Sequence, residues 1–149
     1  LKDALFLGIY DFIFDTFEIE DIKRKISIAT DLGHMDNVIL ENLKGSSFIL
    51  LESNYDPEIL KVSKYPYILK QRIAGPNGHL SNSTAGKTIG CLIQNDLKTV
   101  MLGHLSKENN FPELAYQTVV EELIGQNIDT NEISLSVANR NNPTKIIEL

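Results

Sequence analysis

Apolar runs of strand length alternate along this chain with segments whose apolar residues recur at helical spacing. The strand-like runs are short and rich in leucine or β-branched residues: 25–29, 47–51, 99–102, 133–137 and 146–149. The helix-like segments are 35–43, a short one from 57, 66–74, 81–94 and 112–124. Strands that alternate with helices predict an α/β fold, in which helices pack on a sheet.

Local signals refine these expectations. Asp56 followed by Pro57 is typical of a helix start, and Gly45 predicts the end of the preceding helix. Residues 9–19 are aromatic and β-branched and predict one or two further strands. The charged residues 20–25 then predict a solvated turn between two strands.

The charge balance of the chain is acidic. Its 149 residues include 14 Lys and Arg against 20 Asp and Glu, a net charge of −6. This balance argues against a protein that holds nucleic acid by bulk positive charge. It does not exclude a nuclease whose metal ions meet the phosphates, because those cations are then the largest local charges. The length suits one domain, and no repeat or linker divides it, so residues 1–149 are expected to form a single domain.

Cysteine usage and hydropathy indicate the compartment. Cys91 is the single cysteine, so no internal disulfide can form, and a reducing cytoplasm is expected. No apolar run approaches the length of a membrane span, and no membrane partner is expected.

Polar residues cluster at three places near predicted strand or helix ends. The clusters are TDLGH (30–34), GHLSN (78–82) and GHLSKENN (103–110). Aspartate and histidine together are ligands for zinc or manganese, and the strand ends of an open α/β sheet are where ligands bind. Taken singly, each cluster has an ordinary explanation, because a lone aspartate often caps a helix and a lone histidine often serves structure.

Four blocks of sequence, in this order, carry a resemblance to a known family. The blocks are IATDLGH, FILLESNYDPEIL, YPYILKQRIAGPNGHLSN and MLGHLSKENN. Over roughly residues 9–149 the chain resembles the C-terminal half of the WalJ-type (YycJ-type) metallo-β-lactamase-fold hydrolases, bacterial cytoplasmic exonucleases that act on DNA. The resemblance implies half of an αββα sandwich, with a mixed sheet, flanking helices and metal ions at one edge. It also implies hydrolysis of phosphodiester bonds, with DNA as the substrate.

The resemblance assigns roles to three residues of the clusters. Asp31 matches an aspartate that bridges two divalent ions, zinc or manganese, because a carboxylate has two oxygens. His104 matches the last histidine ligand of that metal centre. His79 resembles a histidine near the scissile phosphate, which would stabilise developing charge or protonate the leaving oxygen.

Four further polar residues lie beside these three. Lys107 and Asn109 follow His104 and are predicted to contact phosphate, with a solvated side chain as the alternative for Lys107. Glu52 and Asn54 end a predicted strand, where they either orient the metal ligands or satisfy the strand end.

The chain departs from the family pattern in ways that affect its function. The HxHxDH motif is absent, as is a further ligand histidine expected near 17–20, and the whole chain holds three histidines. We therefore expect that this sequence lacks an N-terminal half and a loop between Ile19 and Glu20. Tyr55 stands where the family usually has histidine, a change that either removes a catalytic group or only alters packing behind the site.

Two other functions stay open at this point. A narrow cleft would favour a small phosphodiester or ester as substrate, whereas a broad groove beside His79 with Lys70, Arg72 and Lys107 exposed would favour nucleic acid. A truncated relative without bound metal would instead be a non-catalytic interaction module. A lone half sandwich would also expose an apolar sheet face, which predicts either missing chain or a homo-oligomer.

Two weaker signals have simpler structural explanations. Gly86-Lys87-Thr88 resembles the end of a phosphate-binding loop, but Ser81 stands where that motif requires glycine. Tyr65 and Tyr67 could stack on a nucleotide base, although packing under a helix is the simpler expectation.

Overall fold

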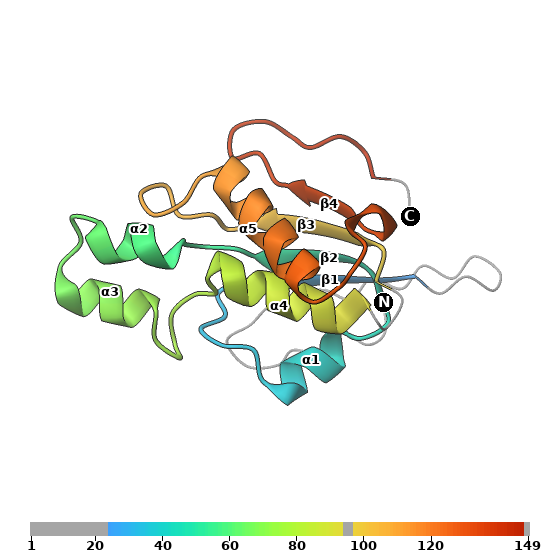
Figure 1. Cartoon of the computed structure of the whole chain (residues 1–149), viewed down its shortest axis with the longest axis horizontal. Helices are drawn as coiled ribbons and strands as arrows, with labels where there is room; N and C mark the ends of the chain where they lie inside the picture. Colours follow the sequence, from blue (N-terminus) through green and yellow to red (C-terminus); the bar gives the residue numbers. More distant parts are fainter. Residues whose placement is uncertain (1–23, 94–96, 148–149) are drawn as a thin grey trace, which may run out of the picture.

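Four parallel strands form the sheet of this protein (Figure 1). The computed structural model describes residues 24–93 and 97–147. The strands are β1 (Lys25–Ala29), β2 (Ser46–Glu52), β3 (Thr99–Gly103) and β4 (Ser134–Val137). They lie in the sheet in chain order, and each pair of neighbours is parallel. Parallel neighbours need crossover connections, which helices provide here.

The helices are α1 (Asn37–Leu43), α2 (Pro57–Val62), α3 (Tyr67–Ile73), α4 (Asn82–Ile93), α5 (Pro112–Gly125) and the short 3-10 helix η1 (Thr130–Glu132). Helices α4 and α5 pack on each other over one face of the sheet, whereas α2 and α3 form a pair that projects beyond the end of β2 (Figure 1). Among the described residues, no helix has the length and apolar character that a membrane crossing requires.

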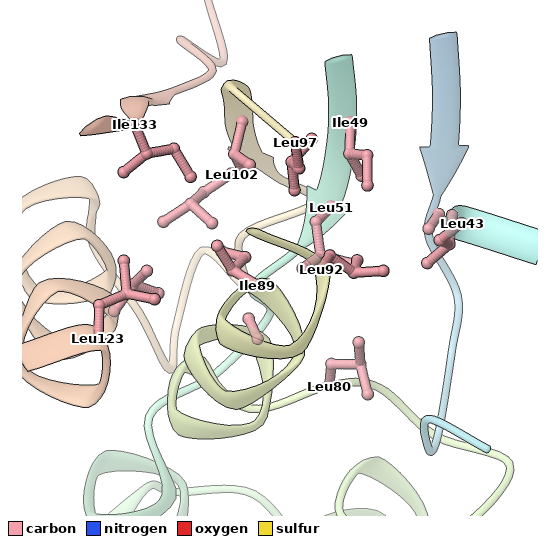
Figure 2. Close-up of a cluster of buried hydrophobic side chains, with 14 of the residues drawn as sticks. Leu43, Ile49, Leu51, Leu80, Ile89, Leu92, Leu97, Leu102, Leu123 and Ile133 are labelled. Carbon is pink, nitrogen blue, oxygen red and sulfur yellow. The ribbon is translucent and has the colours of Figure 1, made fainter. Parts of the chain in front are cut away.

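The core lies between the sheet and the helices α4 and α5 (Figure 2). Alternate residues of β2 and β3 point into it, among them Ile49, Leu51 and Leu102, which are fully buried. Ile89 of α4 and Leu123 of α5 meet them from the helical side. This contact fixes the orientation of the sheet relative to its helices and leaves the strand ends clear of the core.

The opposite face of the sheet is also apolar. Phe48 and Leu50 of β2 pair with Ile26 and Ile28 of β1, and all four are half-buried. An α/β layer with a second apolar face is consistent with half of a metallo-β-lactamase-like sandwich, in which another layer covers that face. The sequence predicted a mixed sheet; the four described strands are all parallel, and the strands predicted within 9–19 lie outside the described residues.

Predicted elements within the described residues mostly occur within two residues of their expected bounds. Helix α1 begins at Asn37 rather than at Met35 because the side chain of Asp36 accepts a hydrogen bond from Ile39 N–H at 2.8 Å and caps the helix. The strand predicted at 146–149 was wrong at 146–147, where the chain has no regular structure and Ile146 is 93% exposed. An apolar pair forms no strand unless a neighbouring strand bonds to it. The rest of that strand and nearly all of the turn predicted at 20–25 lie outside the described residues.

Gly86, in the triplet that resembles a phosphate-binding loop, serves helix packing. A Cβ atom there would lie 2.6 Å from the Cβ of Glu122 and 3.3 Å from the Cα of Val119, both in α5. The missing side chain therefore lets α4 and α5 approach closely, which accounts for this glycine without a nucleotide site.

We expect Gly86→Val to destabilise the protein by about 1–3 kcal/mol, because the added side chain overpacks the contact between α4 and α5. Urea unfolding followed by circular dichroism measures the loss. Lys87→Val is the control, since Lys87 is exposed on the same helix and gains the same β-branched side chain without the clash. Equal stability of the two variants would contradict this account of Gly86.

Candidate metal site

Asp31, His79 and His104 come together at one edge of the sheet and form a cluster. Asp31 follows β1, His104 follows β3, and His79 lies in the loop before α4. Each side chain offers one ligand atom, and these atoms all lie within 4.8 Å of one another. Asp31 Oδ1 is 3.8 Å from His79 Nδ1 and 3.8 Å from His104 Nε2. The structure thus brings together the three residues that the resemblance placed at the reaction centre.

The parallel register of the sheet explains why these residues meet. Ala29 of β1 pairs with Leu51 of β2, and Leu51 pairs with Leu102 of β3, so the three strands end at the same level. The residues that follow the strand ends therefore share one edge. In open α/β sheets this is the edge at which ligands bind.

Glu52, the last residue of β2, holds both histidine rings of the cluster. Its side chain is fully buried, and its Oε1 accepts hydrogen bonds from His79 Nδ1 and His104 Nδ1, each at 2.7 Å. Its Oε2 accepts from the backbone N–H of Leu32 at 2.8 Å. A carboxylate only accepts hydrogen bonds, so both rings carry a proton on Nδ1, and Nε2 is the atom left for a metal or a substrate. Carboxylates orient metal-binding histidines in this way in many proteins.

The charges of the cluster favour a cation. The hydrogen bond to Glu52 raises the pKa of His104, and the negative charges of Glu52 and Asp31 act in the same direction against the opposing effects of burial and Arg140. The side chain of Asp31 is 65% exposed, so its carboxylate is open to a ligand from solvent. The exposed carboxylate of Asp31 and the buried carboxylate of Glu52 thus place two negative charges beside the two imidazoles, which favours a bound cation.

Asp31 and His104 both have a left-handed backbone conformation, with φ of 57° and 55°. In the described ranges, only Asn127 shares this conformation among the residues other than glycine. Aspartate, asparagine and histidine adopt this conformation more readily than other residues with a side chain, and such conformations concentrate at functional sites. The residue types at the two strand ends thus suit the tight turns that bring their side chains to the cluster.

Two glycines let the loops that carry Asp31 and His79 pack closely. A Cβ atom on Gly33 would lie 2.1 Å from the backbone O of Pro76, and one on Gly78 would lie 2.1 Å from the backbone O of Ile73. Both obstacles are backbone atoms, which cannot rotate aside as a side chain can. Gly33 therefore permits the close approach of the two loops, and Gly78 permits the loop that carries His79 to pack against the end of α3.

The other residues predicted for the site occupy different places. Asn54 is buried beside the cluster, and its Nδ2 donates to the backbone O of His104 at 2.6 Å, which helps to hold that residue. Lys107 is exposed but does not line the cavity that contains the cluster, so its phosphate contact stays a prediction. Asn109 is fully buried, and a direct contact with substrate does not fit that position.

A buried pair of asparagines, which the sequence did not single out, joins the loops behind the cluster. Asn82 and Asn110 exchange two side-chain hydrogen bonds, with Nδ2–Oδ1 distances of 3.0 and 2.8 Å. Asn110 Nδ2 also donates to the backbone O atoms of Ser53 and Asn54 at 2.9 and 3.1 Å. The available signal was position, because each asparagine ends a polar cluster at or near the start of an expected helix.

A cavity of about 820 Å³ extends from the cluster toward α3. Asp31, His79 and His104 line one part of it. Its other walls include residues of α3 and the loops on either side of that helix: Tyr65, Leu69, Arg72, Ile73, Asn77 and Gly78. A ligand that reaches the cluster therefore also meets α3.

Tyr55 does not line this cavity. Its side chain is buried and contributes to a separate cavity of about 410 Å³ between α2 and α3, with Leu60 and Tyr67. Burial raises the pKa of Tyr55, and the charge of Glu52 adds to the effect, so the phenol stays neutral. Of the two readings that the sequence left open, the structure favours packing behind the site.

Similarity to curated proteins covers about two thirds of the chain, although no protein-family profile matches it. The Exodeoxyribonuclease YycJ of Bacillus anthracis is 35% identical over 101 residues, which are 68% of this chain and 38% of that protein. The Exodeoxyribonuclease WalJ of Streptococcus pneumoniae serotype 2 (strain D39) is 40% identical over 96 residues, which are 64% of this chain and 36% of that protein.

The chain thus spans 38% and 36% of the length of these two relatives. The similarity agrees with the α/β layer and its apolar second face, which are consistent with half of a metallo-β-lactamase-like sandwich. At 35–40% identity over about two thirds of its length, the chain is similar to the WalJ/YycJ-type family.

Proposed function

We propose that the protein hydrolyses phosphodiester bonds of DNA with divalent metal ions and acts from the ends of the DNA chain. The observation that carries the proposal is the pair of histidines anchored by Glu52 beside Asp31. Catalytic metal sites combine histidines and carboxylates in this manner, with outer carboxylates that orient the rings. The relatives named exodeoxyribonucleases support DNA as the substrate and its ends as the point of attack.

The donor set fits a divalent ion such as zinc or manganese. Asp31 Oδ1 and His104 Nε2 are 3.8 Å apart, a separation that one ion could bridge, because metal bonds to nitrogen and oxygen are each about 2 Å long. The described residues supply three ligand atoms here, fewer than two ions need. The remaining ligands would come from water or from parts of the protein outside the described residues.

Each residue of the site has a separate task in this proposal. Bound divalent ions would polarise the scissile phosphate and make hydroxide available near neutral pH. Asp31 and His104 would hold the ions, and Glu52 keeps the His104 ring in orientation. The Nδ1–H group of His79 stays hydrogen-bonded to Glu52, so Nε2 would face the leaving oxygen. A protonated ring could give that oxygen a proton and so neutralise its negative charge.

Two alternatives make different predictions. Hydrolysis of a small phosphodiester or ester would use the same residues, but the cavity runs on from the cluster to Tyr65 and Arg72, which favours a polymer. A non-catalytic interaction module would hold no stoichiometric metal, so elemental analysis of protein purified without a chelator separates it from an enzyme. We place the activity in the cytoplasm, in keeping with the single cysteine of the chain.

Asp31→Asn is the most direct test of the proposal. Asparagine tolerates the left-handed backbone of this position, so the variant should fold normally while it loses the charge that attracts a cation. We expect metal-dependent cleavage of an end-labelled DNA oligonucleotide to slow by about 100-fold or more. Elemental analysis should also find less metal per chain.

Asp36→Asn is the matched control for this variant. Asp36 caps α1 outside the cluster, and asparagine caps a helix equally well, so metal content and cleavage should be unchanged. Full metal content together with full cleavage in Asp31→Asn would remove the cluster from the proposed reaction.

A further inference from the structure

Helices α2 and α3 form an arm that projects from the sheet beside the cluster (Figure 1). We define the arm as residues 57–75, which follow β2 after a connection of four residues and are followed by the loop that carries His79. We infer that the arm holds an unpaired DNA strand, with Arg72 on a backbone phosphate and Tyr65 against a base. This inference rests on the proposed function and specifies the form of the substrate at the same site.

The arm is cationic, in contrast to the chain as a whole. It carries four cationic side chains, Lys61, Lys64, Lys70 and Arg72, against one carboxylate, Glu58, in a chain of net charge −6. Three of the cations, Lys61, Lys64 and Arg72, are exposed. Positive charge gathered at one place on an acidic protein attracts phosphate to that place, because the rest of the surface repels it.

One side of the arm lines the cavity that contains the cluster. Tyr65, Leu69 and Arg72 share its walls with His79 and His104. A strand whose terminal phosphodiester lies at the cluster would therefore continue along this side of α3. The planar guanidinium group of Arg72 suits phosphate, since it can donate two parallel hydrogen bonds to two oxygens.

The arm is fixed to the cluster by backbone contacts. The N–H of His79 donates to the backbone O of Ile73 at 2.9 Å, directly after Arg72. Gly78 packs against the same oxygen so closely that a Cβ atom would lie 2.1 Å from it. The backbone therefore sets the separation of Arg72 and His79, which suits two residues that contact one substrate at fixed spacing.

The arm also presents aromatic and apolar side chains. Tyr67 is 72% exposed and Ile68 is 80% exposed, while Tyr65 and Leu69 line the cavity. Aromatic side chains beside cations are typical of surfaces that bind single strands, because the bases stack on them. The bases of a duplex are already stacked on one another and cannot reach such side chains, so the arm favours an unpaired strand.

The test measures the affinity of the whole protein for a fluorescent single-stranded oligonucleotide by anisotropy, and the cleavage of that oligonucleotide with manganese. Arg72→Ala should weaken binding about tenfold, the effect of one charged hydrogen-bonding group. The slope of log affinity against log salt should fall by about 0.7, the value for one phosphate contact on a single strand. KM should rise more than kcat falls. Lys87→Ala, which removes an exposed cation from α4, should leave binding unchanged within about twofold.

Tyr65 tests the stacking part of the inference. Tyr65→Ala should weaken single-strand binding about 5- to 150-fold, the range for one stacked base, whereas Tyr65→Phe keeps the ring and should bind normally. Unchanged single-strand binding by both Arg72→Ala and Tyr65→Ala would overturn the inference while the proposed function stands. A blunt duplex that binds as tightly as the single strand, with the same loss on Arg72→Ala, would overturn it as well. Failure of the unaltered protein to bind metal or to cleave any oligonucleotide would instead overturn the proposed function.

Discussion

Asn110→Ala should lower the free energy of unfolding by about 3 kcal/mol or more. The buried side chain of Asn110 donates to Asn82 and to the backbone O atoms of Ser53 and Asn54. Asn82 Oδ1 and the backbone O of Asn54 keep other donors, Ser53 Oγ and the N–H of Ser106. Alanine does leave the backbone O of Ser53, the Nδ2 of Asn82 and the N–H of Phe111 without their hydrogen bond, and each buried polar group left unsatisfied costs about 1–3 kcal/mol. Urea unfolding measures the loss as a lower midpoint at an unchanged m value.

Asn109→Ala is the matched control, because Asn109 is the adjacent residue and is equally buried. Its Oδ1 has no hydrogen-bond partner among the described residues, and its Nδ2 makes one long hydrogen bond of 3.4 Å to Ser106 Oγ. We expect Asn109→Ala to cost less than half as much stability as Asn110→Ala. Equal losses in the two variants would contradict the stabilising role of the asparagine pair.

The asparagine pair also predicts strong coupling between its members. Once Asn110 is replaced by alanine, the Asn82 side chain lacks both of its hydrogen bonds to Asn110. Removal of that side chain then eliminates the Nδ2 donor that the first substitution left unsatisfied. The double variant should therefore cost clearly less than the sum of the two single variants.

The parts of the fold that the sequence predicts well are those in which local chemistry agrees with packing. Asp56 and Pro57 start α2 as expected, because the side chain of Asp56 accepts from the first N–H groups of the helix. The apolar run at 47–51 becomes β2, which has parallel neighbours on both sides. Where no neighbour is described, as at 146–147, a similar apolar signal forms no strand.

The sequence indicates site residues better than it indicates their partners. Asp31, His79 and His104 stand in blocks that resemble a known family, and two of them follow strand ends. The contacts of Glu52 depend on the order of the sheet, which places β2 between β1 and β3. Asn109 and Asn110 are adjacent and identical in type, and only packing shows that one is bonded throughout while the other is not.

Glu52→Gln should weaken metal binding by about 10- to 100-fold, the usual effect of losing a carboxylate that orients a metal-binding histidine. The carboxylate of Glu52 accepts three hydrogen bonds, from His79, His104 and the Leu32 N–H. A glutamine amide presents its own N–H₂ donors on one side, so at least one of these three donors loses its acceptor. Calorimetric titration of the metal-free protein with zinc or manganese measures the change in affinity.

Glu58→Gln is the control for the same chemical change at a different place. Glu58 is exposed on α2 and lies 3.6 Å from Lys61 in a surface ion pair, which contributes little, so metal affinity should be unchanged. Glu52→Gln leaves the proposed ligands Asp31 and His104 in place, so a loss of affinity would report the orientation of the His104 ring. In the metal-free variant the pKa of His104 should also fall, because the hydrogen bond to Glu52 is the main cause of its raised value. Unaltered affinity together with an unaltered His104 pKa would mean that the buried carboxylate does not control the rings, and the cluster would then lose its support as a metal site.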